Sequence, residues 1–311
     1  MMQKLKLGID IGGTNTAFGI VNEEGEIIFQ DAISTKGHPD INTFIDVLFK
    51  TLNDKIDNKI FQNIVSIGIG APNGNYYTGN IEFAPNLEWK GVIPLAKLFE
   101  EKFHLPIKVS NDANAAAMGE MMYGAAKGMK DFIMVTLGTG VGSGFVANGQ
   151  LIYGHDGFAG ELGHVIAIRD GRMCGCGRKG CLETYTSATG IVKTANEFKV
   201  KKDSESPLKM IEHITSKDIY DAAKNGDKLA LEIFEYTGKI LGQTLADAVA
   251  ITSPEAIILF GGLAMAGHFI FDPVKKHFEE NVLVIYKNKV KIIPSLLHQN
   301  DVAILGAAAL N

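Results

Sequence analysis

The sequence is poor in cysteine and tryptophan and has no long apolar run. Its 311 residues include three cysteines and one tryptophan. An odd, low number of cysteines is not typical of a secreted protein held together by disulfides. No uninterrupted apolar run approaches the roughly 20 residues that a membrane-spanning helix needs, and the opening "MMQKLKLGID" lacks the apolar segment of a signal peptide. We therefore expect a soluble, cytoplasmic protein without a membrane partner.

An excess of positive charge is also absent. The formal net charge is −5 at pH 7, which gives no electrostatic attraction for nucleic acid or an anionic membrane. Hydrophobic residues make up 46% of the chain, enough for two cores, and the length fits two domains of roughly 150 residues each. We expect no nucleic-acid partner.

An internal repeat predicts the architecture. Three pairs of similar segments follow in the same order in the two halves of the chain: 6–28 with 132–154, 64–74 with 256–267, and 109–122 with 297–310. The first pair reads as three short strands joined by glycine turns, and the second as a buried strand that ends in glycines. In the third pair, Asn-Asp precedes an alanine-rich helix, for which Asn or Asp is a good N-cap. The pattern predicts a duplicated β-β-β-α-β-α unit, and hence two related α/β domains that face each other across a cleft.

The domain boundaries follow from the repeat. We expect a smaller N-terminal α/β domain over residues 1–122 and a larger α/β domain over 123–300, with the C-terminal helix 301–311 packing back on the first. Additional helices are expected in the larger domain over 187–199, over 203–214, after a capping box at 215–218, and over 227–250.

Two glycine turns, "DIGGTN" (10–15) and "LGTGVGSG" (137–144), have the composition of phosphate-binding loops, and "FGG" (260–262) ends a later strand. Glycine lets several backbone N–H groups point at one anion, and a carboxylate such as Asp10 is suited to hold Mg²⁺. Hairpin turns that merely need glycine are the alternative. The candidates for binding phosphate and Mg²⁺ are Asp10, Gly12, Gly13, Thr14, Asn15, Gly138, Thr139, Gly140, Gly261 and Gly262.

All three cysteines fall in one segment, at positions 174, 176 and 181, shortly after His164. Cys174 and Cys176 are too close in sequence for an unstrained disulfide, and no Cys-x-x-Cys pair is present. Three thiolates and one imidazole would complete a tetrahedral zinc site, and the interposed glycines let the loop curl around one ion. The alternative is three reduced thiols in a turn.

Five motifs, "GIDIGGTN", "NDANAAAMGE", "LGTGVGSG", "AGELGH" and "CGCGRKGCLE", together resemble the ROK family of repressors, open reading frames and sugar kinases. The resemblance covers essentially the whole chain. It implies the actin-like (ribonuclease H-like) ATPase fold, with two domains flanking a cleft, and ATP with Mg²⁺ as cofactors. It also implies structural zinc bound by His164, Cys174, Cys176 and Cys181. We further expect a homodimer.

The resemblance also suggests a sugar site. Asp112 is the only basic group that the "NDAN" motif offers near a sugar hydroxyl, which makes it the candidate general base. The alternative is that Asp112 merely caps the helix. The resemblance favours the catalytic role. The residues expected to contact the sugar are Gly74, Asn86, Asn111, Asp112, Glu161, His164 and Glu183. One segment departs from the family: where Gly-x-Pro-Gly is frequent, this chain has "GAPNGNYY" (70–77).

The leading functional expectation is an ATP-dependent kinase that phosphorylates the 6-hydroxyl of a hexose, with glucose as the first substrate to test. Kinases of N-acetylmannosamine, N-acetylglucosamine, mannose or fructose are the alternatives within the family. A sugar-sensing repressor would carry a DNA-binding domain before the first strand, which is expected to begin by Lys4. An actin-like or chaperone-like ATPase would not need the cysteine loop or the pair Glu161 and His164.

Overall fold

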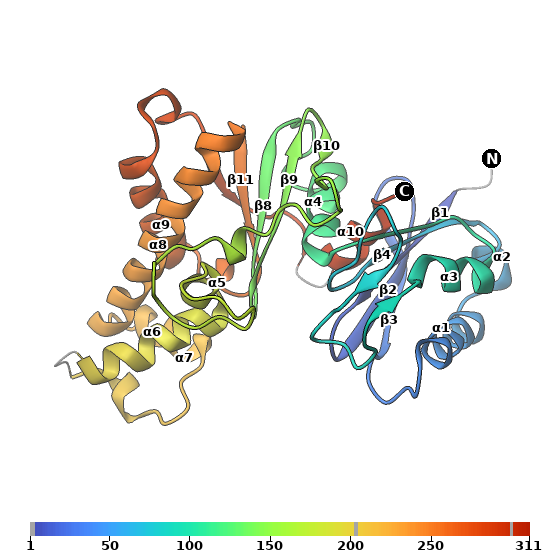
Figure 1. Ribbon diagram of the computed structural model, residues 1–311, viewed down its shortest axis with the longest axis horizontal. Coiled ribbons are helices and arrows are strands. Elements are labelled where there is room, and N and C mark those ends of the chain that lie inside the picture. Colours follow the sequence, from blue (N-terminus) through green and yellow to red (C-terminus); the bar gives the residue numbers. More distant parts are fainter. Residues whose placement is uncertain (1–3, 202–204, 299–300) are drawn as a thin grey trace.

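The structure is a computed structural model that describes residues 4–201, 205–298 and 301–311, and it forms two lobes joined at their centre (Figure 1). Each lobe is built on a five-stranded sheet. In the part of the chain that the structure describes, no helix combines the length and apolar character required to cross a membrane.

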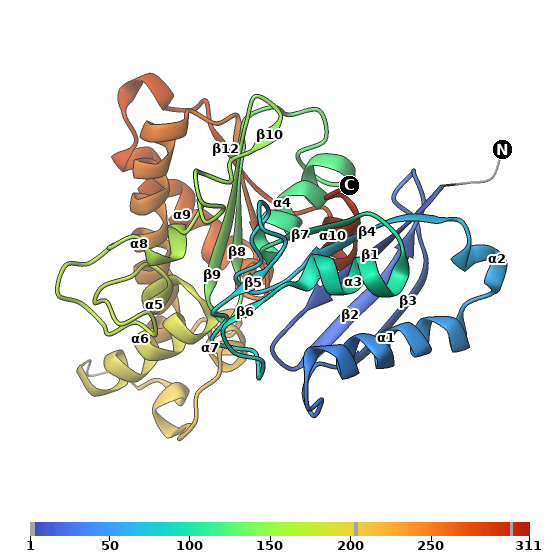
Figure 2. The ribbon, with the colours of Figure 1, turned by 45° about the vertical axis from the view of Figure 1, so that its right-hand side comes forward.

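The first lobe holds the sheet of order β3-β2-β1-β4-β7. Its strands are β1 (Leu5–Ile11), β2 (Asn15–Val21), β3 (Ile27–Ser34), β4 (Ile64–Gly70) and β7 (Ile107–Ser110). β1, β2 and β3 form an antiparallel meander, whereas β4 and β7 run parallel to β1. The remaining elements are α1 (Ile41–Lys55), α2 (Asn58–Phe61), the short pair β5 (Ile81–Glu82) and β6 (Val92–Ile93), and α3 (Leu95–Phe103). Figure 2 shows α1 and α3 beside this sheet.

The second lobe repeats this pattern in the order β10-β9-β8-β11-β12. Its strands are β8 (Phe132–Leu137), β9 (Val141–Ala147), β10 (Gln150–Leu151), β11 (Ala256–Phe260) and β12 (Lys291–Pro294). Again the first three are antiparallel and the last two parallel to β8. Its helices are α5 (Glu183–Thr186), α6 (Ala188–Lys201), α7 (Ser216–Lys224), α8 (Lys228–Thr252) and α9 (His268–Asn281). The repeat predicted from the sequence is present, but each unit contains one strand more than predicted (β7 and β12).

Two helices occupy the centre of the molecule, between the sheets: α4 (Asp112–Tyr123) and α10 (Val302–Ala308) (Figures 1 and 2). Small residues let them lie directly on their neighbours. A Cβ at Gly68 on β4 would be 1.7 Å from Ala307 O of α10, and one at Gly144 on β9 would be 2.6 Å from Ala117 Cβ of α4. A Cβ at Gly306 would be 2.5 Å from Ala115 O, so the two helices are in backbone contact. Consequently α10 packs on the first sheet and α4 on the second.

Not every predicted helix is present. Residues 203 and 204 lie outside the described residues, and the rest of the segment 203–214 forms only a 3₁₀ turn at Pro207–Met210. Proline fits the first turn of a helix, but Ile211 is already extended (φ −87°, ψ 119°), so the helix expected there is wrong. The capping box is confirmed, because Thr215 and Asp218 cap each other at the start of α7.

The C-terminal helix begins as predicted, but its expected cap does not act as one. Asp301 precedes α10, yet its side chain makes no capping hydrogen bond. Asn300, the other half of the expected Asn-Asp pair, lies outside the described residues.

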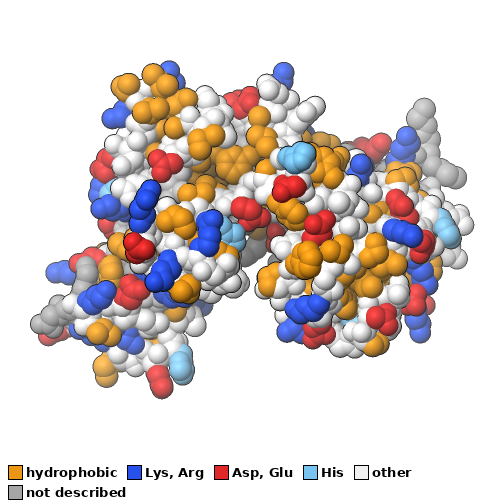
Figure 3. Space-filling model, in the orientation of Figure 1, with side chains coloured by type: hydrophobic (Ala, Val, Ile, Leu, Met, Phe, Trp, Pro, Cys, Tyr) orange, Lys and Arg blue, Asp and Glu red, His pale blue; other side chains and the backbone are white. Residues whose placement is uncertain are grey.

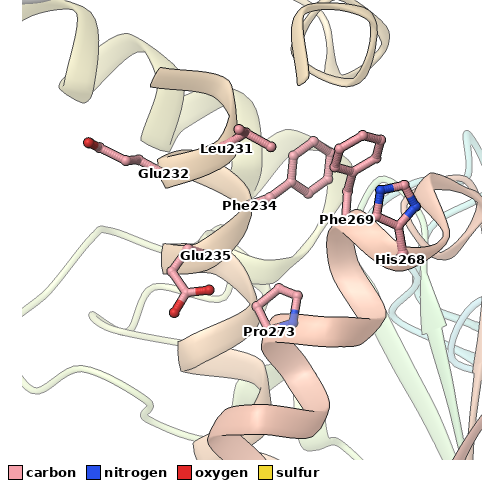
Figure 4. Close-up of a pocket in the computed structure, with 7 residues that line it drawn as sticks. All are labelled: Leu231, Glu232, Phe234, Glu235, His268, Phe269 and Pro273. Carbon is pink, nitrogen blue, oxygen red and sulfur yellow. The ribbon is translucent and has the colours of Figure 1, made fainter. Parts of the chain in front are cut away.

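α8 and α9 pack on each other in the second lobe, and an open pocket of about 420 Å³ lies between their N-terminal parts (Figure 4). Its lining residues are Leu231, Glu232, Phe234, Glu235, His268, Phe269 and Pro273. None of them is a residue that the sequence assigns to sugar, nucleotide or metal.

Glu120 links α4 to the segment that leads from β12 to α10. This carboxylate is fully buried (0% exposed). Its Oε2 accepts the N–H of Ala125 at 2.6 Å, and its Oε1 accepts the hydroxyl of Ser295, directly after β12. A buried carboxylate with two donors fixes the chain where the lobes join.

We expect Glu120→Ala to lower the free energy of unfolding by about 2 kcal/mol or more, because it removes a fully buried carboxylate that accepts hydrogen bonds from Ala125 and Ser295. Urea denaturation followed by circular dichroism measures the change. Glu101→Ala is the matched control, since Glu101 is exposed and faces Lys97 only at 3.9 Å; it should change stability by less than about 1 kcal/mol. Equal effects of the two substitutions would contradict the role of Glu120.

Candidate active site

Two aspartates converge where the first sheet meets α4. Asp10 lies near the end of β1, and Asp112 is the first residue of α4. Both lie beside Gly70 at the end of the neighbouring strand β4: a Cβ there would be 3.4 Å from Asp10 Oδ1 and 3.7 Å from Asp112 Cα. Parallel strands end at the same edge of a sheet, so the fold brings together two carboxylates that are 102 positions apart in the chain.

Asn111, and not Asp112, caps α4. The Asn111 side chain accepts the N–H of Asn114 at 2.7 Å, in the usual manner of a helix N-cap. Asp112 Oδ1 accepts the N–H of Ala113 at 2.8 Å, and among the described residues Asp112 Oδ2 accepts no hydrogen bond. One oxygen of Asp112 is therefore available to a ligand, and the helix does not need Asp112 as its cap.

The surroundings of these aspartates favour the protonated acid. Burial, followed by the charge of Asp112, raises the pKa of Asp10 to about 7. Burial also raises the pKa of Asp112, although the N–H of Ala113 opposes the shift. Asp112 is exposed to solvent, but protein atoms lie close around its carboxylate and reduce its hydration.

The predicted glycine turns border the same region. Gly12, Gly13, Thr14 and Asn15 form the turn from β1 to β2, in which Gly12 N–H donates to Asn15 O at 3.0 Å. Gly138, Thr139 and Gly140 form the equivalent turn from β8 to β9. Gly261 and Gly262 follow β11, and a Cβ at Gly261 would be 2.7 Å from Leu137 O, so this segment adjoins the second turn.

Contacts tie the second turn to α6. Ala188 N–H donates to Gly138 O at 2.8 Å, and the hydroxyl of Thr189 donates to Thr139 O at 2.8 Å. The N-terminus of α6, whose backbone N–H groups carry partial positive charge, therefore lies beside the turn. This is a suitable place for an anion.

The histidine and the three cysteines form one cluster. One ligand atom from each of His164, Cys174, Cys176 and Cys181 lies within 4.8 Å of every other. The sulfurs of Cys176 and Cys181 are 3.6 Å apart, and Cys174 Sγ is 3.7 Å from His164 Nδ1. Tetrahedral zinc with its usual bond lengths holds its ligand atoms about 3.6 Å apart. The donor set and its spacing therefore fit zinc.

Arg172 anchors the cysteine loop to α6. Its guanidinium bonds both oxygens of Glu197, at 2.7 and 2.9 Å, and donates to Thr184 O at 2.7 Å. It also stacks on Tyr185, 4.4 Å from the ring centre. The sequence pattern gave no sign of this anchor, because its partners follow 12 to 25 residues later.

The cluster also brings the expected sugar-contacting side chains together. His164 Nε2 is 3.9 Å from Glu161 Oε2, and His164 Nδ1 is 3.8 Å from Glu183 Oε1. Burial raises the pKa of Glu161, which also feels the charge of Asp112, so these groups share one site. A Cβ at Gly140 would be 2.8 Å from Glu183 Oε2, which places this carboxylate next to the glycine turn after β8.

A cleft of about 540 Å³ lies between the two lobes, next to the cysteine cluster. Figure 3 shows the surface hollowed between the lobes. The lining residues of the cleft are Pro72, Asn73, Pro85, Asn86, Thr139, Gly140, His164, Gly175, Cys176, Glu183, Thr184, Thr189 and Lys193. Asn86 is exposed in it, and a Cβ at Gly13 would be 2.8 Å from Asn86 O. Three of the expected sugar residues, Asn86, His164 and Glu183, thus line the same cleft as the glycine turn after β8, whereas Asn111, Asp112 and Glu161 are not among its lining residues.

Gly74 does not offer a donor to this cleft. It is buried, and its N–H donates to Ala71 O at 3.0 Å. A Cβ there would be 2.4 Å from Ser110 O, so Gly74 allows the turn to lie against the end of β7. Asn73, Thr189 and Lys193 line the cleft instead, and no motif in the sequence pointed to them.

Sequence comparison identifies sugar-related proteins. The profile described as "ROK family" matches residues 6–311. A glucokinase from Halalkalibacterium halodurans is 39% identical over 292 residues, which cover 91% of this chain and 88% of that protein. A xylose repressor from Caldicellulosiruptor bescii is 30% identical over 98% of this chain and 77% of the repressor.

Comparison with solved structures also finds a member of the ROK family. The crystal structure of a ROK family glucokinase from Streptomyces griseus, in complex with glucose and AMPPNP, has a TM-score of 0.81 at 32% identity and covers 98% of both chains. The predicted actin-like fold with two domains is confirmed by this likeness. The boundary expected between residues 122 and 123 stays a prediction.

We expect Asp10→Asn to stabilise the protein in the absence of Mg²⁺ and nucleotide. Because the pKa of Asp10 rises from 3.8 to about 7 on folding, the folded state binds a proton that the unfolded state loses, and wild-type stability falls as the pH rises from about 4 to 7. The increase in the free energy of unfolding caused by Asp10→Asn should therefore be small at pH 4 and about 1 kcal/mol or more at pH 8.

Denaturation at both pH values measures this difference. Asp54→Asn, on the exposed face of α1, is the control and should show no such dependence on pH. An Asp10→Asn protein that is less stable than wild type at pH 8 would contradict the electrostatic account.

Proposed function

We propose that this chain, which belongs to the ROK family, is an ATP-dependent kinase that phosphorylates the 6-hydroxyl of glucose. The observation that carries the proposal is the cleft between the lobes, which is lined by the glycine turn after β8 and lies beside Gly13 of the turn after β1. Asp112, whose Oδ2 accepts no hydrogen bond among the described residues, lies close enough to Glu161 to raise the pKa of that carboxyl. Phosphoryl transfer needs this combination of a proton acceptor near the hydroxyl and an electropositive backbone near the phosphates. The 39% identity to a glucokinase supports glucose as the substrate.

Asp112 is the proposed general base. It accepts the proton of the attacking hydroxyl on Oδ2, the oxygen that accepts no hydrogen bond among the described residues. Burial raises its pKa, which makes its ionised form a stronger base and requires a pH at which that form is populated. We therefore expect activity to fall on acidification at a pH above the ordinary carboxylate range.

The nucleotide is proposed to lie along the glycine turns. Backbone N–H groups of the two turns and of the N-terminus of α6 would contact the phosphates, and the exposed Lys193 would contribute a positive charge. Asp10 would hold Mg²⁺, which neutralises phosphate charge when bound. A bound cation would favour the ionised form of Asp10 and so oppose the burial that raises its pKa.

The sugar is proposed to bind between the lobes. Glu161 and Glu183 would accept hydrogen bonds from sugar hydroxyls, and Asn86 would contribute from the first lobe. Asn111 caps α4 and so holds the start of the helix at Asp112. Mannose, fructose and the N-acetylhexosamines remain the alternative substrates, since the geometry suits any pyranose hydroxyl pattern that presents donors to two carboxylates.

Zinc is proposed to hold the sugar side of the cleft in place. His164, Cys174, Cys176 and Cys181 would bind it, filling all four positions, so that the metal would order the loop and would not activate a nucleophile. Cys174 Sγ lies 3.0 Å from Glu183 Oε1, so the cluster and the sugar-contacting carboxylate are adjacent.

The homodimer and the cytoplasmic location remain predictions. A sugar-sensing repressor is the second candidate function, favoured by the 30% identity to a xylose repressor. The glucokinase relative is the more similar, and the chain covers 88% of it against 77% of the repressor.

We expect purified protein with Mg-ATP to release ADP on addition of glucose, with the highest kcat/KM for glucose in a panel of mannose, fructose, N-acetylmannosamine and N-acetylglucosamine. A coupled ADP assay measures this, and nuclear magnetic resonance of the product identifies the phosphorylated hydroxyl. Glucose binding without ADP release would favour the repressor, and a higher kcat/KM for another sugar would overturn glucose as the substrate.

We expect one zinc ion per chain, lost in Cys176→Ser together with glucose affinity. Elemental analysis of the purified proteins measures the metal, and calorimetry measures glucose binding. Met173→Ser is the matched control, because Met173 is exposed in the same loop and is not part of the cluster. Zinc-free wild-type protein with full activity would contradict the proposal.

A further inference from the structure

The segment that departs from the family pattern, residues 70–77, contacts the opposite lobe. After Gly74, three successive side chains reach residues 153–156, which follow β10 in the second lobe. Tyr76 stacks on Tyr153, with ring centres 3.9 Å apart and planes 10° from parallel. The hydroxyl of Tyr77 donates to Gly154 O at 2.9 Å, and Asn75 Nδ2 donates to Asp156 O at 2.7 Å. These three contacts are called the interlobe contact below.

The partner of this contact is the loop that carries Glu161. No helix or strand is present between β10 and the 3₁₀ turn that begins at Leu162. Gly154, Gly157 and Gly160 all have positive φ, at 77°, 91° and 96°, so this backbone does not follow a regular ladder. The loop 154–161 therefore depends on individual contacts for its position.

Within the described ranges, the second lobe bonds the C-terminal part of this loop, at Ala159 and Gly160, and not residues 154–157. Ala159 N–H donates to Tyr153 O at 3.0 Å, and Ser143 bonds both Gly160 O and the N–H of Leu162. Among the described residues, the hydrogen bonds that hold 154–157 from outside the loop come from Asn75 and Tyr77.

The contact is closely fitted. A Cβ at Gly157 would lie 2.5 Å from Asn75 Oδ1, and Asn75 itself is only 2% exposed. Lys108 lies over the other side of the Tyr76 ring, 5.0 Å from its centre, so Tyr76 is held on both faces. Such a stack orders both partners at a low cost in side-chain entropy, because a tyrosine has few rotatable bonds.

We propose that Asn75, Tyr76 and Tyr77 are positioning residues for the sugar, which hold the loop 154–161 from the opposite lobe and so place Glu161 at the cleft. This inference rests on the proposed phosphorylation of glucose. The three residues act through Glu161 and do not touch the reacting atoms. Asp112 and the glycine turns belong to other segments of the chain, so losing the interlobe contact should weaken sugar binding and leave the chemical step and ATP binding intact.

Steady-state kinetics of Tyr76→Ala test the proposal. We expect KM for glucose to rise about tenfold, with kcat and KM for ATP within about twofold of wild type. Tyr76→Phe keeps the ring and should restore KM. Tyr220→Ala is the matched control, because Tyr220 makes an edge contact with Phe269 on α9 and is remote from the cleft; it should leave KM unchanged. Unchanged KM in Tyr76→Ala, or an equal loss of kcat, would overturn the proposal.

A double-mutant cycle with Glu161→Gln tests whether Tyr76 affects glucose binding through Glu161. If Tyr76 acts through Glu161, Tyr76→Ala should raise KM much less in the Glu161→Gln background than in wild type. Additive effects would contradict the route through Glu161.

Hydrogen exchange provides a readout that needs no substrate. The amides of residues 154–161 should exchange faster in Tyr76→Ala than in Tyr76→Phe or wild type. Unchanged exchange would overturn the proposal even in an active enzyme. If instead wild type fails to phosphorylate glucose while exchange changes as expected, the proposed function fails and the structural role of the contact stands.

Discussion

Close packing at the centre of the molecule is the constraint on which the active site depends. Helices α4 and α10 lie between two sheets and touch through backbone atoms at Gly306, and each sheet accepts a helix at a glycine. A bulkier interface would separate the sheets. Because β1, β4 and β7 are parallel, the start of α4 directly after β7 lies at the edge where β1 and β4 end, and Asp10 and Asp112 share one small region. The protein atoms packed around the two carboxylates make their ionisation costly, and the pKa of each is therefore raised. The proposed proton acceptor and the proposed cation site thus lie side by side where α4 meets the first sheet.

The proposed sugar side of the cleft is organised differently. Here loops and short helical turns, and not strands, carry the side chains: Glu161 lies in a loop, His164 ends a 3₁₀ turn, and Glu183 begins α5. Such loops have no ladder of hydrogen bonds, and other contacts have to fix them. One set is the cluster of His164 with the three cysteines, together with the anchor from Arg172 to α6. Another is the interlobe contact, which approaches from the first lobe. In our account, nucleotide binding depends on rigid turns after strands, and sugar recognition depends on loops held by a metal cluster and by aromatic side chains.

Local patterns in the sequence predicted the parts of this arrangement that depend on neighbouring residues. The meanders, the glycine turns and the start of α4 were predicted because strand alternation, turn residues and helix caps act over a few positions. The cluster was predicted because its three cysteines lie within eight positions. The cap of α4 is Asn111 because the residue before the first turn provides it. Contacts across long separations were missed: Asn75 meets Asp156 over 81 positions. The helix expected over 203–214 failed because Pro207 and the extended Ile211 limit it to one turn.

The central claim is that Asp112 removes the proton of the sugar hydroxyl. Asp112→Asn preserves the shape of this side chain, and α4 keeps its cap at Asn111. The most direct test is therefore to measure, on this one variant, glucose affinity by calorimetry and the rate of phosphoryl transfer in a single turnover. Our account predicts glucose binding close to that of wild type and a rate lower by a factor on the order of 10² or more. A folded Asp112→Asn protein that transfers the phosphoryl group at a near-normal rate would contradict it.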